Sequence, residues 1–380
     1  MIDYGALKNS IMEYREIGKK KIRVSLIGFG GMRLPEISGS DAKRTILSAF
    51  DHGINFFETG WEYGEGRSER LIGQTLKNKR DKVILANKST AYHQGSDEIE
   101  RDLHRSLRNE QTEYFDIYSF WGVNTRDSFQ KAAHPECIDF LLKAKEEGKI
   151  QATGITTHAP PDEIIEFADK IPLDCVTLKY NILTPRMEKA INALRQKNIS
   201  IVIMSPLAGG MIASPKGVIQ KYLVDHKISA ATLGLRYLST NKKITSILSG
   251  MRSEREVREN IRTVDGTPLT DVEKMTIEFI KKRLMGLGER FCTACNYCLP
   301  CPQGVAIADI FKLKNIIAGF GADEYSKGQY WRMQNNPEWS DYHGETADKC
   351  IGCGECEQQC PERLPIIDDL KKAHDMLSHE

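Results

Sequence analysis

The stretch VILANKSTAYHQGSDEIERDLHRSLRNEQTEYFDIYSFW, residues 83–121, holds two short apolar runs separated by an amphipathic segment. The runs Val83–Lys88 and Ile117–Trp121 have the length and the apolar character of buried strands. Between them, apolar residues recur at the spacing of one helix face, at Ile99, Leu103 and Leu107. A strand, a helix and a strand in this order predict a βα unit with parallel strands.

The same alternation continues from Val24 to about Asn260 and gives eight βα units. The strand candidates are Ser25–Gly28, Asn55–Thr59, Val83–Lys88, Ile117–Trp121, Ala152–Thr156, Cys175–Lys179, Ile201–Ser205 and Ser246–Ser249. Eight such units predict an α/β fold of the closed (β/α)8 TIM barrel type. An open doubly wound sheet is the alternative, but the first βα turn, Gly28-Phe29-Gly30-Gly31-Met32, does not complete the G-x-G-x-x-G fingerprint of dinucleotide-binding sheets.

The chain of 380 residues is long enough for a barrel of about 250 residues and a second module. Thr270-Asp271-Val272-Glu273 predicts a capping box that opens an extra helix through about Leu284, and the glycines of residues 286–288 predict a boundary after it. We therefore expect an N-terminal extension and barrel-floor hairpin at 1–23, the barrel at 24–286, and a mainly helical, ferredoxin-like domain at 287–380.

The charge of the chain is balanced, with 53 basic and 52 acidic residues, so nothing in it indicates a nucleic acid or an anionic membrane as partner. No apolar run approaches the ~20 residues that span a bilayer. The N-terminal residues show no apolar segment or cleavage site of a secretory signal. The sequence predicts a cytoplasmic protein that acts on a small molecule.

Eight of the ten cysteines form two short runs, each of which ends in Cys-Pro, and we expect these eight residues to bind metal: Cys292, Cys295, Cys298, Cys301, Cys350, Cys353, Cys356 and Cys360. Successive C-x-x-C steps followed by Cys-Pro are typical of [4Fe-4S] clusters, which take four thiolates each. Zinc knuckles and disulfides are weaker alternatives, because zinc sites use two separated pairs and disulfides need an oxidising compartment.

The pairing of the two runs is open. In two-cluster ferredoxins the last cysteine of each run binds the other cluster, which would place Cys301 with the second run and Cys360 with the first. Each run could also close its own cluster. The two remaining thiols, Cys137 and Cys175, are most simply ordinary buried residues.

In TIM-barrel enzymes the reactive side chains lie at the C-terminal ends of the strands. Glu58 ends the second strand candidate, Tyr63 follows it, and Lys88 ends the third. A buried lysine needs an opposite charge, which Glu58 supplies, and it would lower the pKa of a nearby tyrosine so that the phenol serves as a general acid. His158, at the end of the fifth candidate, is a substitute acid or, more simply, a pocket-lining residue.

The segment after the eighth strand candidate, Gly250-Met251-Arg252, runs into Ser253-Glu254-Arg255-Glu256, which predicts a capping box. A helix N-terminus with two arginines at the usual phosphate position of a barrel predicts a binding site for an anion.

Several segments of the chain resemble the aldo-keto reductase family. The cysteine-bearing tail resembles an iron–sulfur branch of that family, the predicted aldo/keto reductases. The resemblance extends over nearly the whole chain. It implies an NAD(P)(H)-dependent barrel that reduces carbonyls. The matching segments are residues 53–59 (GINFFET), Tyr63-Gly64-Glu65-Gly66, Lys88, residues 114–118 (YFDIY), residues 154–158 (GITTH), residues 205–210 (SPLAGG) and Glu259-Asn260.

The family's catalytic tetrad is Asp, Tyr, Lys and His. Tyr63 and Lys88 match it, Glu58 replaces the aspartate with a longer arm, and Trp121 stands at the histidine position. An indole offers one N–H donor and no titratable proton, and its size would narrow the pocket, so the substrate or the reaction would differ from ordinary carbonyl reduction.

The resemblance makes the bound anion a cofactor phosphate and favours NADP(H) over NAD(H), although Glu256 stands where many NADP(H)-dependent relatives carry arginine. Thr157 and Thr177 replace the asparagine and glutamine that hold the nicotinamide amide in many relatives. The expected cofactor contacts are Thr156, Thr157, Thr177, Ser205, Leu207, Gly209, Arg252, Ser253, Arg255, Glu259 and Asn260.

The leading hypothesis is an oxidoreductase in which Tyr63, tuned by Lys88 and Glu58, protonates an oxygen while NADP(H) delivers hydride. Nicotinamides pass two electrons together, whereas an iron–sulfur cluster passes one, so the two parts need an intermediary, a flavin or a substrate radical, unless the clusters are structural or sensory. NAD(H) and a flavin remain alternatives to NADP(H) as the cofactor of the barrel. The rival function is one-electron transfer with a ferredoxin-type partner, the barrel then being a docking or cofactor scaffold. A scaffold with vestigial chemistry is the third possibility.

Overall fold

The computed structural model describes residues 12–208, 212–213, 223, 228–264, 266–285, 292, 296–320, 323–336, 342 and 344–378. The chain divides into two compact units. The first unit takes residues 1–180, 184–206 and 235–269, and the second takes residues 181–183, 207–234 and 270–380. In the described part of the chain, no helix is both long and apolar enough to cross a bilayer.

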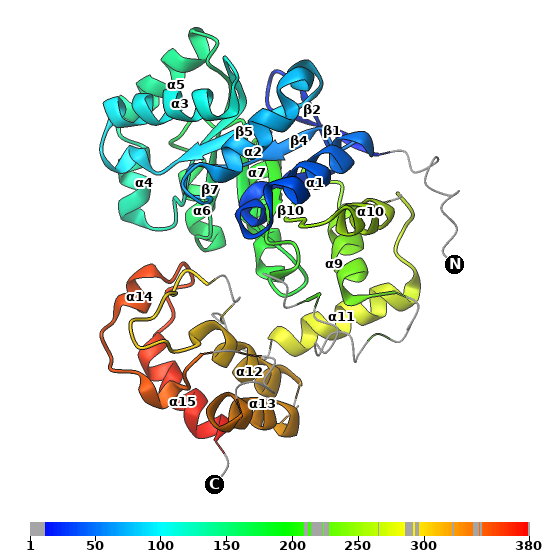
Figure 1. Ribbon diagram of the computed structural model, residues 1–380, viewed down its shortest axis with the longest axis vertical. Coiled ribbons are helices and arrows are strands. Elements are labelled where there is room, and N and C mark those ends of the chain that lie inside the picture. The colour runs from blue at the N-terminus through cyan, green and yellow to red at the C-terminus, as the bar shows by residue number, and fades with distance from the viewer. Residues whose placement is uncertain are drawn as a thin grey trace. The chain divides into compact units, whose positions relative to one another are not determined.

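Eight parallel strands form a closed barrel in the first unit, with neighbours in the order β10-β3-β4-β5-β6-β7-β8-β9. This confirms the predicted TIM-barrel class (Figure 1). The strands are β3 (Ile27–Gly30), β4 (Phe56–Glu58), β5 (Ile84–Ser89), β6 (Phe115–Phe120), β7 (Ile150–Thr157), β8 (Cys175–Lys179), β9 (Ser200–Met204) and β10 (Ser246–Ser249).

A short antiparallel hairpin precedes the barrel, formed by β1 (Tyr14–Ile17) and β2 (Ile22–Ser25). Ile17 and Val24 are fully buried and pack in one cluster with inward-facing strand residues such as Phe56. Ser25 therefore belongs to the hairpin, and the first barrel strand starts at Ile27 rather than at Ser25 as the apolar pattern indicated. Residues 1–11 lie outside the described ranges.

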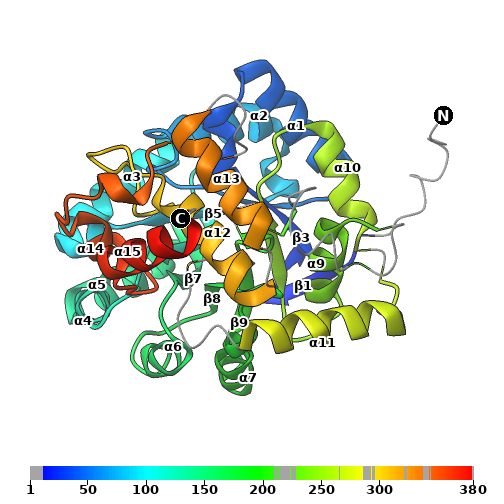
Figure 2. The ribbon, with the colours of Figure 1, turned by 90° about the horizontal axis from the view of Figure 1, so that it is seen from below.

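The helices of the barrel alternate with the strands along the chain, and α1 lies between α2 and α10 (Figure 2). Ile99, Leu103 and Leu107 are buried on α3, which confirms the helix expected there. The helices are α1 (Gly39–Asp51), α2 (Arg67–Leu76), α3 (Ser96–Glu110), α4 (Arg126–Ala132), α5 (Pro135–Glu146), α6 (Pro161–Phe167), α7 (Glu188–Gln196), α9 (Ala230–Ser239) and α10 (Glu254–Arg262), with the 3-10 helices η2 (Gly31–Glu36), η3 (Lys77–Lys82), η4 (Ala91–His93) and η5 (Pro185–Met187).

The second unit is helical in its described parts. Its elements are α11 (Asp271–Met285), α12 (Ile307–Phe320), α13 (Asp323–Asn335), η8 (Ala347–Lys349), α14 (Glu355–Gln359) and α15 (Ile366–Leu377). The capping box of α11 is formed as expected: the Thr270 N–H donates to the Glu273 carboxylate at 2.7 Å, and the Glu273 N–H donates to Thr270 Oγ1 at 3.2 Å. The expected boundary at residues 286–288 lies outside the described residues, so the domain limits stay predictions.

Candidate functional site

The three expected catalytic residues come from two neighbouring strands and the turn after the first of them. Glu58 is the last residue of β4, and Lys88 lies near the end of β5, which pairs with β4 in parallel. Tyr63 lies in a tight turn in which its N–H donates to the Gly60 carbonyl at 3.1 Å. Parallel strands end on one face of a barrel, so these side chains meet there.

Lys88 joins the other two residues. Its Nζ donates a hydrogen bond to the Tyr63 hydroxyl at 2.7 Å and forms an ion pair with the Glu58 carboxylate. Lys88 is 5% exposed and Glu58 is 7% exposed, so the pair is shielded from water. Burial lowers the pKa of Lys88 well below its ordinary value, because the ammonium loses its hydration, and the Glu58 carboxylate compensates the buried charge.

Trp121 forms a wall of this arrangement. Its ring meets the Tyr63 ring edge to face, with centroids 5.0 Å apart and an angle of 71° between the planes. The Lys88 ammonium lies 4.6 Å from the indole centroid and 4.5 Å from the phenol centroid. The two aromatic faces therefore add cation–π attraction to the hydrogen bond that holds Lys88 beside Tyr63.

His158 is buried at the end of β7. Burial and the positive charges of Lys179 and Lys88 lower the pKa of His158 to about 3. The imidazole is therefore neutral near pH 7 and is a poor general acid, which favours the pocket-lining role over that of substitute acid.

Sequence reasoning missed Lys179. This residue ends β8, is 2% exposed, and lies near enough to His158 to act on its charge. The signal was present, because a lysine that ends a predicted barrel strand is the same pattern that identified Lys88.

A buried polar network supports Lys88 from the outer side of β5. The Lys88 N–H donates to Asn87 Oδ1 at 2.6 Å, and Asn87 Nδ2 donates to Glu69 at 2.9 Å and to Glu110 at 2.7 Å. Ser106 and Asn109 also donate to Glu69, both at 2.7 Å. Burial, together with the nearby Glu69 charge, raises the pKa of Glu110 well above its ordinary value.

This raised pKa predicts a pH dependence of stability. The folded state holds the Glu110 proton more tightly than the unfolded state, so the stabilisation is complete below the unfolded pKa of about 4.3 and is lost as the pH rises through the folded pKa. Glu110→Gln removes this titration. As the pH rises above the unfolded pKa, the wild type therefore loses unfolding free energy, and we expect Glu110→Gln to lose less of it over the same pH range.

The measurement is urea unfolding of the barrel followed by near-UV circular dichroism at several pH values. Glu113→Gln is the matched control, because Glu113 lies just beyond α3 and is exposed. Parallel pH profiles of the wild type and Glu110→Gln would show that Glu110 does not titrate as described.

The expected nicotinamide contacts are placed as follows. Thr156 and Thr177 line a small lumen cavity of about 10 Å³ together with Glu58 and Lys88. Thr157 Oγ1 donates to the Val123 carbonyl at 2.6 Å, so its hydroxyl is engaged by the backbone. Ser205 and Leu207 follow β9 in the chain, and Gly209 lies outside the described residues.

The expected phosphate site lies at the start of α10. Ser253 caps this helix by accepting the Glu256 N–H at 3.3 Å, but the Glu256 carboxylate accepts the N–H of Arg252, at 2.7 Å, rather than that of Ser253. The Ser253 half of the predicted capping box is therefore formed, whereas the Glu256 carboxylate reaches one residue further back, to the N–H of Arg252. Asn260 Nδ2 donates to Ser249 Oγ at 2.9 Å and ties α10 to the end of β10.

The arginines of this site already have acidic neighbours. Arg252 lies 3.7 Å from Glu36 and 3.9 Å from Glu256, and Arg255 lies 2.9 Å from Glu259. These side chains are largely exposed, so each pair is weak by itself. An incoming phosphate would meet carboxylates as well as guanidinium groups.

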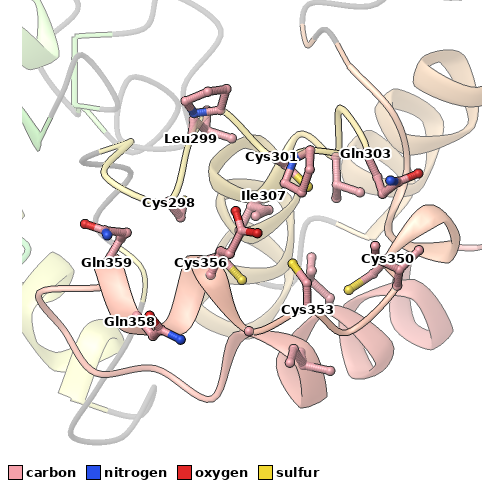
Figure 3. Close-up of a pocket in the computed structure, with 18 of the residues that line it drawn as sticks. Cys298, Leu299, Cys301, Gln303, Ile307, Cys350, Cys353, Cys356, Gln358 and Gln359 are labelled. Carbon is pink, nitrogen blue, oxygen red and sulfur yellow. The ribbon is translucent and has the colours of Figure 1, made fainter.

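The cysteines of the second unit surround two cavities. A cavity of about 340 Å³ is lined by Cys301 and by three cysteines of the second run, Cys350, Cys353 and Cys356, with Cys298 at its wall (Figure 3). A smaller cavity of about 20 Å³ is lined by Cys292, Cys298 and Cys360. Cys295 lies outside the described residues.

This distribution fits [4Fe-4S] clusters with crossed pairing, in which Cys301 joins the second run and Cys360 joins the first. Each iron of a cube takes one thiolate, so the ligands surround a cavity. In the described part of the chain, no group of three His, Cys, Asp or Glu side chains is placed to hold a single metal ion. Apolar side chains contribute to both walls, since Ile307 lines both cavities and Phe311 lines the smaller one, while Gln303, Gln358 and Gln359 also line the larger cavity.

Comparisons with known proteins agree with both parts of the chain. The model of the aldo/keto reductase family matches residues 26–281, and the model of a 4Fe-4S dicluster domain matches residues 291–364. L-galactose dehydrogenase of Arabidopsis thaliana is 30% identical over 301 residues, which cover 71% of this chain and 93% of that protein. The uncharacterized oxidoreductase YqkF of Bacillus subtilis is 25% identical over 298 residues, covering 69% of this chain and 94% of that protein.

Two solved structures resemble the barrel. The holo form of aldo-keto reductase AKR11C1 from Bacillus halodurans has a TM-score of 0.62 and 26% identity, and the match covers 70% of this chain and 96% of that one. An aldo/keto reductase from Klebsiella pneumoniae in complex with NADP and acetate has a TM-score of 0.60 and 20% identity, over 70% of this chain and 95% of that one. The second likeness shows the fold alone.

Proposed function

Because the chain belongs to the aldo/keto reductase family and carries a 4Fe-4S dicluster domain, we propose that this oxidoreductase reduces the carbonyl group of a small molecule with a nicotinamide dinucleotide. The observation that carries the proposal is the buried contact of Lys88 with both Tyr63 and Glu58. A phenol beside a buried ammonium is the proton donor that carbonyl reduction needs.

The reaction balances as carbonyl plus NAD(P)H plus one proton giving alcohol plus NAD(P)⁺. When bound, the dinucleotide supplies the hydride that forms the new C–H bond. Tyr63 supplies the proton that forms the new O–H bond, and the Lys88 ammonium stabilises the phenolate that is left. Glu58 keeps Lys88 charged, and Trp121 limits the space beside Tyr63 without supplying a proton of its own.

The side chains at the start of α10 determine whether NADP(H) or NAD(H) binds more tightly. The sequence pattern favours NADP(H), with Arg252, Ser253, Arg255, Glu259 and Asn260 as its contacts, whereas the carboxylates beside Arg252 oppose an added phosphate. Glu256→Arg is expected to raise the affinity for NADPH relative to NADH by roughly tenfold, because it replaces a negative charge with a positive one beside the expected phosphate position.

The matched control is Glu254→Arg, which makes the same charge change on the same helix but at a carboxylate that lies near Arg44 and Arg258 instead. Fluorescence titration of both dinucleotides measures the ratio. Equal changes in the two variants would show that only the overall charge matters and that Glu256 is not at the phosphate site.

For the dicluster domain, we propose that the cavity of Cys301, Cys350, Cys353 and Cys356 and the site of Cys292, Cys295, Cys298 and Cys360 each hold one [4Fe-4S] cluster. Each cluster would exchange single electrons, with a ferredoxin-type protein as candidate partner. One-electron chemistry with the barrel as scaffold is the second candidate function, and the match to the dicluster domain favours it.

Anaerobic purification followed by iron, sulfide, flavin and bound-nucleotide analysis separates the two candidates. Saturable binding of NADPH or NADH without flavin supports hydride transfer in the barrel. Bound flavin, or no binding of either nicotinamide, would favour the one-electron function.

A further inference from the structure

The ammonium group of Lys88 lies beside two aromatic rings as well as beside its polar partners. Its Nζ carries three N–H bonds. The Tyr63 hydroxyl accepts one of them at 2.7 Å, and the Glu58 carboxylate forms the ion pair. Within the residues that the structure describes, no further acceptor bonds to Nζ. The rings of Tyr63 and Trp121 lie beside it instead, with centroids at 4.5 Å and 4.6 Å.

Trp121 is fixed by its backbone and packs closely against Lys88. Its N–H donates to the Ser89 carbonyl at 2.8 Å, and its carbonyl accepts the Tyr92 hydroxyl at 3.1 Å. Gly60 borders both the indole and the lysine, because a Cβ atom at this position would lie 3.2 Å from Trp121 Cζ3 and 3.2 Å from Lys88 Cγ. The lack of a side chain at Gly60 therefore lets the indole and the lysine stem pack this closely.

We propose that Trp121 is a positioning residue for proton transfer, whose indole face holds the charged Lys88 side chain beside the Tyr63 hydroxyl. This inference deepens the proposed carbonyl reduction and rests on it. An indole attracts a cation more strongly than a phenyl or phenol ring does, and the attraction is largest where water is excluded. It acts only on the ammonium form, so it favours charged Lys88 over the neutral amine.

Burial opposes the charge that this role requires. Lys88 is 5% exposed, and the loss of hydration lowers its pKa well below the ordinary value. A neutral Lys88 would no longer stabilise the phenolate that Tyr63 becomes when it gives up its proton. Glu58 opposes this loss of charge by ion pairing, and the two rings oppose it by cation–π attraction. Removing the indole therefore weakens the proton donor and leaves Glu58, Lys88 and Tyr63 in place.

The titratable groups that act on this site come from several elements. Glu58 ends β4 and Tyr63 follows it, while His158 follows β7 and Lys179 ends β8. His158 is neutral because its pKa is about 3, so its charge stays constant in an alkaline titration. Lys88 and Lys179 both lower that pKa. Lys179 is the same in every variant below, so comparison between variants isolates the effect of the indole.

The first test measures the ionisation of Tyr63 in protein purified without oxygen. Tyrosine is labelled with ¹³C at Cζ, and the NMR signal of Tyr63 is identified by its absence in Tyr63→Phe. Trp121→Phe keeps a weaker aromatic face, and Trp121→Leu keeps none. At a fixed alkaline pH, the ratio of ionised to neutral Tyr63 should fall by about threefold to tenfold from wild type to Trp121→Leu, with Trp121→Phe in between.

The matched control is Trp331→Leu, the same substitution at a tryptophan that is 45% exposed on α13. It should leave the titration of Tyr63 unchanged. Equal ratios of ionised to neutral Tyr63 in the wild type, Trp121→Phe and Trp121→Leu would overturn the proposal.

The second test changes the electron distribution of the indole and leaves its shape almost unchanged, so it needs no variant that folds poorly. Fluorine atoms draw electron density from the ring face and weaken its attraction for a cation. All four tryptophans are replaced by monofluoro-, difluoro- or trifluorotryptophan. The ratio of ionised to neutral Tyr63 should fall stepwise in the wild type and stay constant in Trp121→Phe. No fall in the wild type, or equal falls in both proteins, would overturn the role of the Trp121 face.

Failure of this inference can be distinguished from failure of the proposed function, because neither titration needs turnover. A titration of Tyr63 that depends on Trp121 supports the inference even if no carbonyl compound is reduced. Loss of carbonyl reduction in Tyr63→Phe, together with a titration that does not depend on Trp121, would overturn the inference and leave the proposed function intact. A change of KM alone in Trp121→Phe, with an unchanged titration, would show that the indole only limits space and would also overturn it.

Discussion

Replacing Tyr63 by Phe is expected to lower kcat for carbonyl reduction by about 10²- to 10⁴-fold, the usual contribution of a positioned general acid. The substitution removes the hydroxyl that accepts the Lys88 hydrogen bond at 2.7 Å and leaves the ring that packs on Trp121. The pocket therefore keeps its shape while the proton donor is lost. Affinity for the dinucleotide and iron content should stay close to wild type.

Tyr114→Phe is the matched control. Tyr114 immediately precedes β6, at the opposite end of the strands from Lys88, and its ring lies against Arg80. This variant should retain wild-type kcat. If Tyr63→Phe reduced carbonyls within a few-fold of the wild-type rate, the proton would have to come from another group and the proposed role of Tyr63 would be wrong.

The second large effect concerns the crossed pairing of the cysteine runs. The cavity linings place Cys301 with Cys353 and place Cys360 with the first run. The double variant Cys301→Ala/Cys353→Ala should therefore damage one cluster and keep about four of about eight iron atoms. The double variant Cys360→Ala/Cys353→Ala should damage both clusters.

If each run closed its own cluster, the two double variants would exchange these outcomes. Iron and sulfide analysis of anaerobic protein gives the content, and electron paramagnetic resonance of the reduced protein shows whether an intact [4Fe-4S] signal remains. An intact signal in Cys360→Ala/Cys353→Ala, with none in Cys301→Ala/Cys353→Ala, would contradict the crossed pairing.

The barrel was predictable because its signals are local. Each barrel strand is a short apolar run and each helix shows its own spacing, so eight barrel strands were expected and the barrel has eight. The ends of the strands also follow from these runs. The sequence alone therefore predicts that Glu58 and Lys88 lie at one face of the barrel, where the structure shows their ion pair. Tyr63 could be added because it follows the second strand in a short turn.

The features of the fold and of the site that the sequence did not predict depend on contacts between distant parts of the chain. Ser25 reads as a barrel strand residue, but the pairing of β2 with β1 removes it from the barrel. The position of Lys179 beside His158 requires the register of β7 and β8, which no local pattern contains. Glu36 and Arg252 are more than two hundred residues apart in the chain, and the fold brings their side chains together. The charge balance of the phosphate site could therefore not be predicted from the sequence.

Cluster pairing was unpredictable for the same reason. The spacing within each run identifies the ligands but does not say which run closes which cube. The helices α12 and α15 pack in one core with cysteines of both runs, and this packing brings the two runs to shared cavities.

The central claim is that the barrel transfers a hydride directly to a carbonyl carbon, and deuterium transfer tests it most directly. The wild-type protein is incubated without oxygen with a small carbonyl compound and with NADH or NADPH that carries deuterium at the hydride-bearing carbon, and the alcohol is analysed by mass spectrometry. The account predicts one deuterium on the new carbinol carbon. An alcohol that contains only solvent hydrogen at that carbon would show that the hydride does not pass directly from the dinucleotide to the carbonyl carbon, which would contradict the account.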